Sequence, residues 1–207
     1  MSQRAFFTED ARSKVAAVVA EVEAQTSVEI VVALRKASGH YRHTDYLAAI
    51  LVATASLLMF LFYPEPFDID LYPIEAAGFF AFGALTSAFF PPLRRALTSR
   101  RLMDRFAGTA ARAAFVELGI SRTRARTGVL VFVSMFERRV EVVADIGVHE
   151  AALGTDWKDA LHRLLGAVKR GELDRFLDGL RAMGPVLAGA LPRAADDVNE
   201  LSDEART

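Results

Sequence analysis

Apolar residues are concentrated in two runs near the middle of the chain. The first run extends from Tyr46 to Tyr63 without a charge, and the second extends from Ile74 to Phe90 with Glu75 at its edge. A helix of a soluble protein normally keeps one polar face, and neither run has such a face. Because about 20 apolar residues cross a bilayer as a helix, with a lower limit near 17, the pattern predicts two transmembrane spans rather than buried core helices.

The short segment between the runs, from Pro64 to Pro73, makes the predicted spans an antiparallel hairpin over residues 46–92. It carries Glu65, Asp68 and Asp70 but neither Lys nor Arg. Basic residues flank the hairpin at Arg35, Lys36, Arg42, Arg94, Arg95, Arg100, Arg101 and Arg105. Since basic residues mark the cytoplasmic side, we expect cytoplasmic flanks and an external turn. Neither span has an ionisable residue at its centre, which favours an anchor over a conduit.

Helical and strand patterns alternate on both sides of the hairpin. Valines recur at helical spacing in residues 8–24, where Thr8 is the expected N-cap, and β-branched runs predict strands. The predicted strands are 27–34, 127–134 and 138–145, and the predicted helices are 8–24, 100–118 and the segments around Trp157–Val168 and Leu173–Leu180. We expect Gly119 to end the helix before it and Gly184-Pro185 to kink or end the last helix.

The strands on either side of the hairpin are too few to be stable separately. We therefore expect one α/β domain, built from residues 1–36 and 93–192, with the hairpin inserted into it. Strands 28–34 and 128–134 would be parallel, because a helix connects them, and 138–145 would pair as a β-hairpin. Residues 193–207 are polar and acidic, so we expect a flexible tail.

Composition excludes several kinds of chemistry. The chain has 207 residues, a formal net charge of −1 and no cysteine. The absence of cysteine excludes disulfides, thiolate metal ligands and a cysteine nucleophile, and the near-zero charge gives no reason to expect a nucleic-acid partner. The first residues lack an apolar core, so we expect no cleavable signal peptide.

Basic residues and histidines form two further candidate sites. Arg122, Arg124 and Arg126 lie in a predicted loop, where they would contact a phosphate, contact an anionic lipid headgroup, or simply be solvated. His40 and His43 are close in sequence, but no further ligand is near, so we interpret them as interfacial polar residues. No P-loop or dinucleotide fingerprint is present, and Ser134 does not follow a nucleophile-elbow pattern.

Several segments resemble the TPM domain family, and in particular its bacterial membrane branch with a transmembrane hairpin. They are FFTEDARSKVAAVVAEVEAQTSVEIVVAL (6–34), RTGVLVFVSMFERRVEVVADIGVHE (126–150), Trp157, VKRGELDRFLDGLRAMGPVLAGALP (168–192) and NEL (199–201). The resemblance implies an α/β sandwich with a small central mixed sheet, interrupted here by the hairpin. It also implies diverse functions, since family members include weak acid phosphatases, assembly or repair factors for membrane complexes, and receptor modulators, several with acidic metal sites.

Asp145 is the candidate metal ligand, because it ends a strand and matches the family position aDxGi. With Glu150, and with Asp156 and Asp159 nearby in sequence, it offers the oxygen ligands that Ca²⁺ or Mg²⁺ prefers. The alternative is an aspartate that caps the turn after the strand, followed by a solvated acidic helix start. The spacing matches no standard metal loop.

The sequence places no nucleophile, base and oxyanion donor in one motif, so catalytic residues remain unassigned. We therefore expect a non-catalytic scaffold, or an assembly or quality-control factor for membrane protein complexes. It would lie in the bacterial cytoplasmic (inner) membrane as a two-span protein, with both termini and the α/β domain cytoplasmic. Its partners would be the bilayer and other membrane proteins. The alternative is a metal-dependent phosphatase-like hydrolase that uses the Asp145 region.

Overall fold

The structure is a computed structural model that describes residues 3–63, 71–194, 199–201 and 206. The carboxylates Glu65, Asp68 and Asp70 of the predicted external turn lie outside the described residues. The chain divides into two compact units, one formed by Met1–Ser38 with Asp104–Thr207 and the other by Gly39–Met103. The second unit contains the predicted insertion at residues 46–92 and extends beyond it on both sides. Each unit is described by itself.

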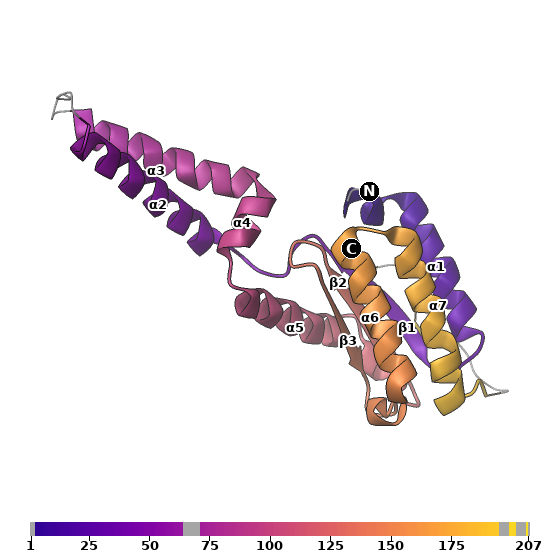
Figure 1. Ribbon diagram of the computed structural model, residues 1–207. Coiled ribbons are helices and arrows are strands. Elements are labelled where there is room, and N and C mark those ends of the chain that lie inside the picture. Colours follow the sequence, from indigo (N-terminus) through magenta and orange to yellow (C-terminus); the bar gives the residue numbers. More distant parts are fainter. Residues whose placement is uncertain (1–2, 64–70, 195–198, 202–205, 207) are drawn as a thin grey trace. The chain divides into compact units, whose positions relative to one another are not determined.

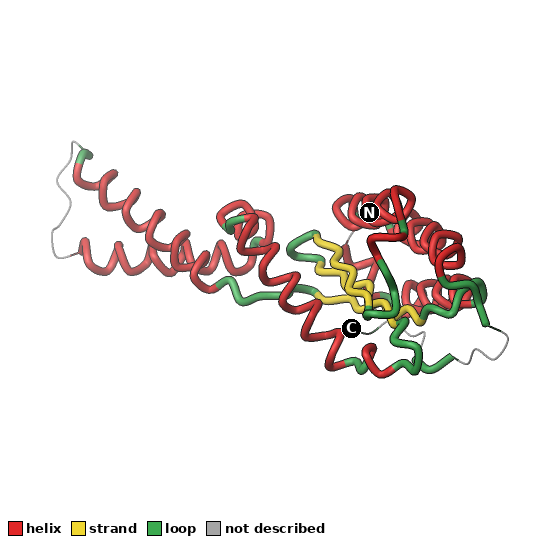
Figure 2. The backbone as a smooth tube through the Cα atoms, turned by 90° about the horizontal axis from the view of Figure 1, so that it is seen from below, coloured by secondary structure: helices red, strands yellow, loops and turns green. Residues whose placement is uncertain are grey.

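The first unit contains a mixed three-stranded sheet with the order β1-β2-β3. The strands are β1 (Glu29–Arg35), β2 (Gly128–Ser134) and β3 (Arg139–Ala144). β1 is parallel to β2, with Glu29 opposite Gly128, and β2 is antiparallel to β3, with Val129 opposite Ala144. Both predicted pairings are confirmed. Figure 2 shows the strands side by side, in yellow.

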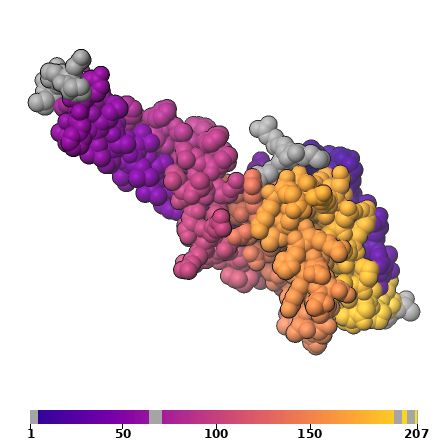
Figure 3. All heavy atoms as spheres, viewed as in Figure 1, coloured from indigo at the N-terminus to yellow at the C-terminus, as the bar shows by residue number. Residues whose placement is uncertain are grey.

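Helices cover both faces of the sheet (Figure 1). One face packs against α1 (Glu9–Glu23), α6 (Gly154–Arg170) and α7 (Leu173–Ala190), and the other packs against α5 (Arg100–Glu117). α6, in orange, and α7, in yellow, adjoin on the face shown in Figure 3. The remaining short helices are η1 (Gln3–Phe7), η3 (Ile120–Arg122) and η4 (Glu150–Ala152).

Alternation of side chains along the strands explains the two helical layers. Val32 of β1 belongs to the core shared with α1, α6 and α7, whereas its neighbour Ala33 belongs to the core shared with α5. Successive side chains of a strand point to opposite faces, so a strand covered on both sides must be apolar throughout. This accounts for the unbroken apolar runs of β1 and β2. β3 is half-buried along its whole length, as its alternating sequence predicts.

The helix ends follow the expected local chemistry, with one exception. Thr8 caps α1, since its Oγ1 accepts a hydrogen bond from the Ala11 N–H over 3.2 Å, and Gly119 is left-handed with φ of 71°. Of the two alternatives predicted for Gly184-Pro185, a kink or an end of the last helix, the end is wrong, because α7 continues to Ala190. Pro185 lies on the exposed side of α7, whereas Met183 and Leu187 are fully buried. Their packing holds the helix together across the hydrogen bond that proline cannot make.

Described residues of the acidic C-terminal segment contact the outer edge of β1. The Arg206 N–H donates to the Val32 carbonyl over 2.9 Å, and the Leu34 N–H donates to the Arg206 carbonyl over 2.7 Å. The Leu201 N–H donates to the Glu29 carboxylate over 3.2 Å. The sequence predicts a flexible tail, whereas these residues pair with a strand edge, whose N–H and C=O groups attract additional chain.

The second unit consists of an antiparallel helix pair and a short third helix. α2 (Arg42–Leu61) packs along α3 (Tyr72–Phe89), and α4 (Pro91–Leu97) follows at an angle of 102°. The helices approach closely at Gly83, where a Cβ atom would lie 2.9 Å from the Ala48 carbonyl oxygen and from the Ala49 Cα. Ala49 is fully buried, whereas Ala77 and Ala81 of α3 are exposed.

Candidate functional site

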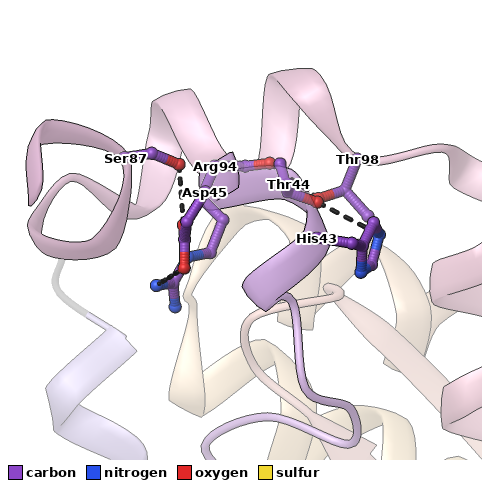
Figure 4. Close-up of polar contacts among 6 residues, drawn as sticks. All are labelled: His43, Thr44, Asp45, Ser87, Arg94 and Thr98. Carbon is purple, nitrogen blue, oxygen red and sulfur yellow. Dashed lines mark hydrogen bonds and ion pairs between the residues drawn. The ribbon is translucent and has the colours of Figure 1, made fainter. Parts of the chain in front are cut away.

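A buried carboxylate joins all three helices of the second unit (Figure 4). Asp45 lies in the first turn of α2, and Arg94 of α4 binds it through two parallel contacts, Nε to Oδ1 over 2.8 Å and Nη2 to Oδ2 over 2.7 Å. Ser87 of α3 donates its hydroxyl to the same Oδ1 over 2.8 Å. We call Asp45, Ser87 and Arg94 the hairpin-base cluster.

The charges within the hairpin-base cluster compensate each other. Asp45 is 9% exposed and Ser87 is fully buried, so an unpaired carboxylate at this place would be costly. Bidentate binding by arginine is the strongest common way to compensate a carboxylate, and the position near the N-terminus of α2 adds a favourable helix dipole. The cluster therefore carries no net charge at the end of an otherwise apolar helix pair.

Hydroxyl groups form a chain of hydrogen bonds beside this cluster. Thr98 Oγ1 donates to the Arg94 carbonyl over 2.7 Å, and Thr44 Oγ1 lies 3.0 Å from Thr98 Oγ1. The His43 Nε2 atom lies 3.2 Å from Thr44 Oγ1. Because Thr98 gives its proton to the carbonyl, Thr44 must donate to Thr98, and His43 must carry a proton on Nε2 and donate to Thr44. This chain ties α2 to the end of α4.

Sequence reasoning did not identify this cluster. The sequence pattern marked Arg94 only as one of the basic residues that flank the hairpin, and it did not single out Asp45. A signal was available, because Asp45 precedes the first apolar run and Arg94 follows the second. In an antiparallel hairpin these two positions lie at the same end, where opposite charges can pair. His40, by contrast, is exposed, and the structure gives His43 a threonine partner.

Asp145, the predicted metal ligand, lies just after β3 and is 4% exposed. It is brought together with Arg126, whose Nη2 donates to Oδ1 over 2.9 Å and whose Nε lies 2.9 Å from Oδ2 as an ion contact. The Ile146 N–H also donates to Oδ1, over 2.8 Å. A guanidinium and a backbone N–H thus both hydrogen-bond Oδ1, whereas the buried Oδ2 has the ion contact with Arg126 but no hydrogen bond from the described residues. Asp145 links the loop before β2 to the turn after β3.

Glu150 begins η4 and is exposed. Within the described residues, no three His, Cys, Asp or Glu side chains form a group that could hold a metal ion. The Ca²⁺ or Mg²⁺ site at Asp145 and Glu150 therefore stays a prediction. What the structure does show at Asp145 is the turn-capping arrangement that was the alternative interpretation of the sequence.

The three loop arginines differ in their surroundings. Arg126 binds Asp145 and has a left-handed backbone with φ of 57°. Arg122 ends η3 with an exposed side chain. Arg124 is also exposed, and its backbone N–H donates to the Glu200 carboxylate over 3.1 Å. Arg126 makes its ion pair through a side chain that is itself 48% exposed, and contact of the three arginines with phosphate or lipid headgroups stays a prediction.

Ser134 belongs to a buried network at the end of β2. It is fully buried and donates a short hydrogen bond to Glu137 Oε2, while Ser38 Oγ donates to Ser134 Oγ over 2.6 Å. The Ser38 N–H donates to Glu137 Oε1 over 2.8 Å. A hydroxyl with no exposed surface cannot reach a substrate, so this serine is a structural link between the chain after β1 and the β2–β3 turn.

Comparisons with known proteins identify the fold and leave the family open. No protein-family model and no curated protein matches the chain. The NMR structure of the BA42 protein from the psychrophilic bacterium Bizionia argentinensis is similar, with a TM-score of 0.56 and 16% sequence identity. The match covers 96% of this chain and 93% of that one. At this identity the similarity concerns the fold alone, and it places the chain among mixed α/β proteins with a small sheet and many helices.

Proposed function

We propose that this protein is anchored in a membrane by the α2–α3 hairpin. The observation that carries the proposal is the exposure of large apolar side chains on both helices and at their ends. Leu61, Phe62 and Phe89 are exposed by 72%, 80% and 82%, respectively. Other apolar side chains at least half exposed on these helices are Tyr46, Ile50, Leu51, Leu58, Met59, Ile74, Phe82 and Leu85.

The area of this apolar surface exceeds that of the apolar residues that a soluble protein exposes singly. Two compact helices leave most of their side chains facing outward, and one third of the most apolar 18-residue window of α2 is buried. A core helix of a soluble protein would be mostly buried. In the described part of the chain, α2 is long and apolar enough to cross a bilayer, and α3 with α4 meets the same criterion as a bent pair.

The lengths of α2 and α3 and the positions of the charged residues support the proposal that lipid surrounds this apolar surface. At about 1.5 Å per residue, the 20 residues of α2 and the 18 of α3 span about 30 and 27 Å, close to the thickness of a bilayer core. The one ion pair of the hairpin-base cluster lies at one end and is internally neutralised. The basic flanks favour the bacterial cytoplasmic membrane, with both termini and the α/β domain in the cytoplasm.

We propose further that the protein acts as a scaffold, or as an assembly or quality-control factor for membrane protein complexes, in line with the TPM-like sequence segments. Its support is the use made of three buried polar groups. Asp145 is occupied by Arg126, Ser134 is buried on Glu137, and Asp45 is occupied by Arg94. In each case the charge or hydroxyl stabilises a junction between elements instead of facing a substrate.

Two measurements test this proposal. Washing membranes with alkaline carbonate should leave the full chain in the pellet, because the hairpin is integral, whereas recovery in the supernatant would contradict the anchor. Crosslinking in native membranes should return the same membrane-protein partners in independent repeats. A full chain that stays in the pellet but yields no reproducible partner would contradict the scaffold and leave the anchor intact.

A further inference from the structure

The described C-terminal residues follow the outer edge of β1. We call residues 199–201 and 206 the tail segment. Near the start of β1, the Leu201 N–H donates to the Glu29 carboxylate over 3.2 Å. Farther along the strand, Arg206 forms a parallel β-bridge with Ala33 through its own N–H and C=O groups. The tail segment therefore runs in the same direction as β1, as a peptide does when it adds a strand to a sheet edge.

Two side chains of the tail segment add specific contacts to this backbone pairing. Leu201 is half-buried and packs against the core that the sheet shares with α5. The Glu200 carboxylate accepts the backbone N–H of Arg124 over 3.1 Å. When a strand is added to a sheet edge, the backbone bonds supply affinity and the side-chain contacts supply specificity. The β1 edge is thus matched to an acidic residue followed by a leucine, with a backbone pairing five residues later.

The tail segment is less firmly packed than the strand it contacts. In the part of the chain that the structure describes, Arg206 is the residue that bridges to β1, and its side chain is exposed. Val32 and Leu34, whose backbone groups bond to Arg206, are fully buried. Segments with few buried contacts open at a much smaller cost in free energy than the core. Another extended segment can therefore replace the tail segment while the sheet stays folded.

The chain just before the tail segment is tied to the residues that precede β1. The Ala194 N–H donates to the Ser27 hydroxyl over 2.9 Å, and the Ser27 N–H donates to the Leu191 carbonyl over 3.1 Å. A segment attached so close to its site has an effective concentration on the order of 1 mM. The tail segment therefore competes strongly with any separate chain that pairs with the β1 edge.

We propose that the outer edge of β1 is a docking site for an extended segment of a partner protein, and that the tail segment is its resident competitor. The partner segment pairs parallel to β1 and displaces the tail segment. It carries the features that fit this edge: an acidic residue next to a leucine, and a residue other than proline at the fifth position after the leucine. That the partner is a membrane protein rests on the scaffold function proposed above.

The test compares two double variants of the full chain in detergent micelles. In the release variant, Leu201→Asp places a charge where the leucine packs, and Arg206→Pro removes the N–H that donates to the Val32 carbonyl. The control variant, Leu201→Met with Arg206→Ala, keeps an apolar side chain and the backbone N–H. Fluorescence anisotropy measures the binding of a labelled synthetic peptide with the sequence of residues 193–207. A second peptide carries both substitutions of the release variant.

We expect the release variant to bind the native peptide saturably. The parent chain and the control variant should bind it about tenfold more weakly or less, because their own tail segment competes. The substituted peptide should not bind the release variant. No binding of the native peptide by the release variant, or equal binding by the release variant and the parent chain, would overturn the proposal. This titration requires neither a partner nor a bilayer, so its outcome is independent of the scaffold function.

Photo-crosslinking in native membranes tests the partner itself. A photoreactive residue replaces Arg35, which is exposed at the end of β1, in the release and control variants. Reproducible crosslinks to another membrane protein, stronger in the release variant, would support the docking site. Crosslinks only to a second copy of this chain, or no gain in the release variant, would overturn it. Partners captured from other positions but not from position 35 would exclude this site alone and leave the scaffold function intact.

Discussion

Arg94 binds both carboxylate oxygens of Asp45, over 2.8 and 2.7 Å, and thereby joins the start of α2 to the helix that follows α3. Ser87 completes the coordination of the carboxylate from α3. The side chains of Arg94 and Asp45 are 26% and 13% exposed. We interpret this pair as the closure of the hairpin, because it joins the start of α2 to the end of α3 and to α4 at one end of the helix pair while presenting no net charge to an apolar environment.

The first prediction concerns this closure. Asp45→Asn should destabilise the hairpin by about 1–3 kcal/mol, because it leaves Arg94 without its charge partner in a partly buried site. Unfolding of the full chain in detergent, followed by circular dichroism, gives the change in free energy. Arg94→Gln should cost a similar amount, and the double variant should cost clearly less than the sum of the two. Additive costs would show that the pair is not coupled.

The second prediction concerns the contact between α2 and α3. Gly83→Ala should destabilise the hairpin by about 1–3 kcal/mol, because the new methyl group would lie 2.9 Å from backbone atoms of Ala48 and Ala49. Gly78→Ala on the same helix is the matched control, since a Cβ there has no neighbour within 4 Å. It should be neutral or slightly stabilising, because alanine favours helix. Equal unfolding midpoints for the two variants would contradict the described packing.

The third prediction concerns pH. Burial raises the pKa of Glu141 on β3 above its ordinary value of 4.5, and the neighbouring Asp104 raises it further. A raised carboxyl pKa means that the folded protein binds the proton more tightly than the unfolded chain. Its contribution to stability is therefore present below pH 4.5 and is lost as the pH rises through the raised pKa.

Glu141→Gln should accordingly raise the Tm at neutral pH, and the gain should shrink as the pH falls toward about 4.5. Thermal unfolding of both proteins across this range measures the effect. Glu117→Gln at the exposed end of α5 should leave the Tm nearly unchanged. A gain from Glu141→Gln that does not depend on pH would exclude titration of this carboxylate as its cause.

The fourth prediction separates the scaffold from a metal-dependent hydrolase. Asp145→Asn removes the charge partner of Arg126 and should lower the free energy of unfolding by about 1–3 kcal/mol. Phosphatase rates with Mg²⁺ or Ca²⁺ should be equally low for the parent chain and the variant. A metal-dependent rate that the variant loses while it remains folded would favour the hydrolase.

Much of the fold could be predicted because each signal is local. The apolar run GVLVFVS predicts a strand buried on both faces, and the helix before it predicts that β2 is parallel to β1. Thr8 and Gly119 mark helix ends through their own backbone chemistry. The predicted end of the last helix at Pro185 was wrong because the effect of this proline on α7 depends on the tertiary packing of Met183 and Leu187. No local sequence pattern reveals that packing.

The candidate sites were harder to predict because they depend on distant pairs. The Asp45–Arg94 contact joins residues 49 positions apart, and the link from Ser38 to Ser134 spans 96 positions. Asp145 was singled out as a metal ligand or a turn cap, whereas its partner Arg126 was assigned to a different site. The sequence shows which side chains could bind or react. The fold decides which residues those side chains contact.

The most direct test of the membrane anchor is its topology. The chain has no native cysteine, so single cysteines can be placed at Asp68, between the predicted spans, and at Thr155, exposed on α6. Intact cells are treated with a membrane-impermeant thiol reagent, and lysed cells serve as the control for reactivity. We predict that Asp68→Cys is labelled in intact cells and that Thr155→Cys is labelled only after lysis. Labelling of Thr155→Cys but not Asp68→Cys in intact cells would contradict the orientation, and identical labelling at both positions would contradict the hairpin.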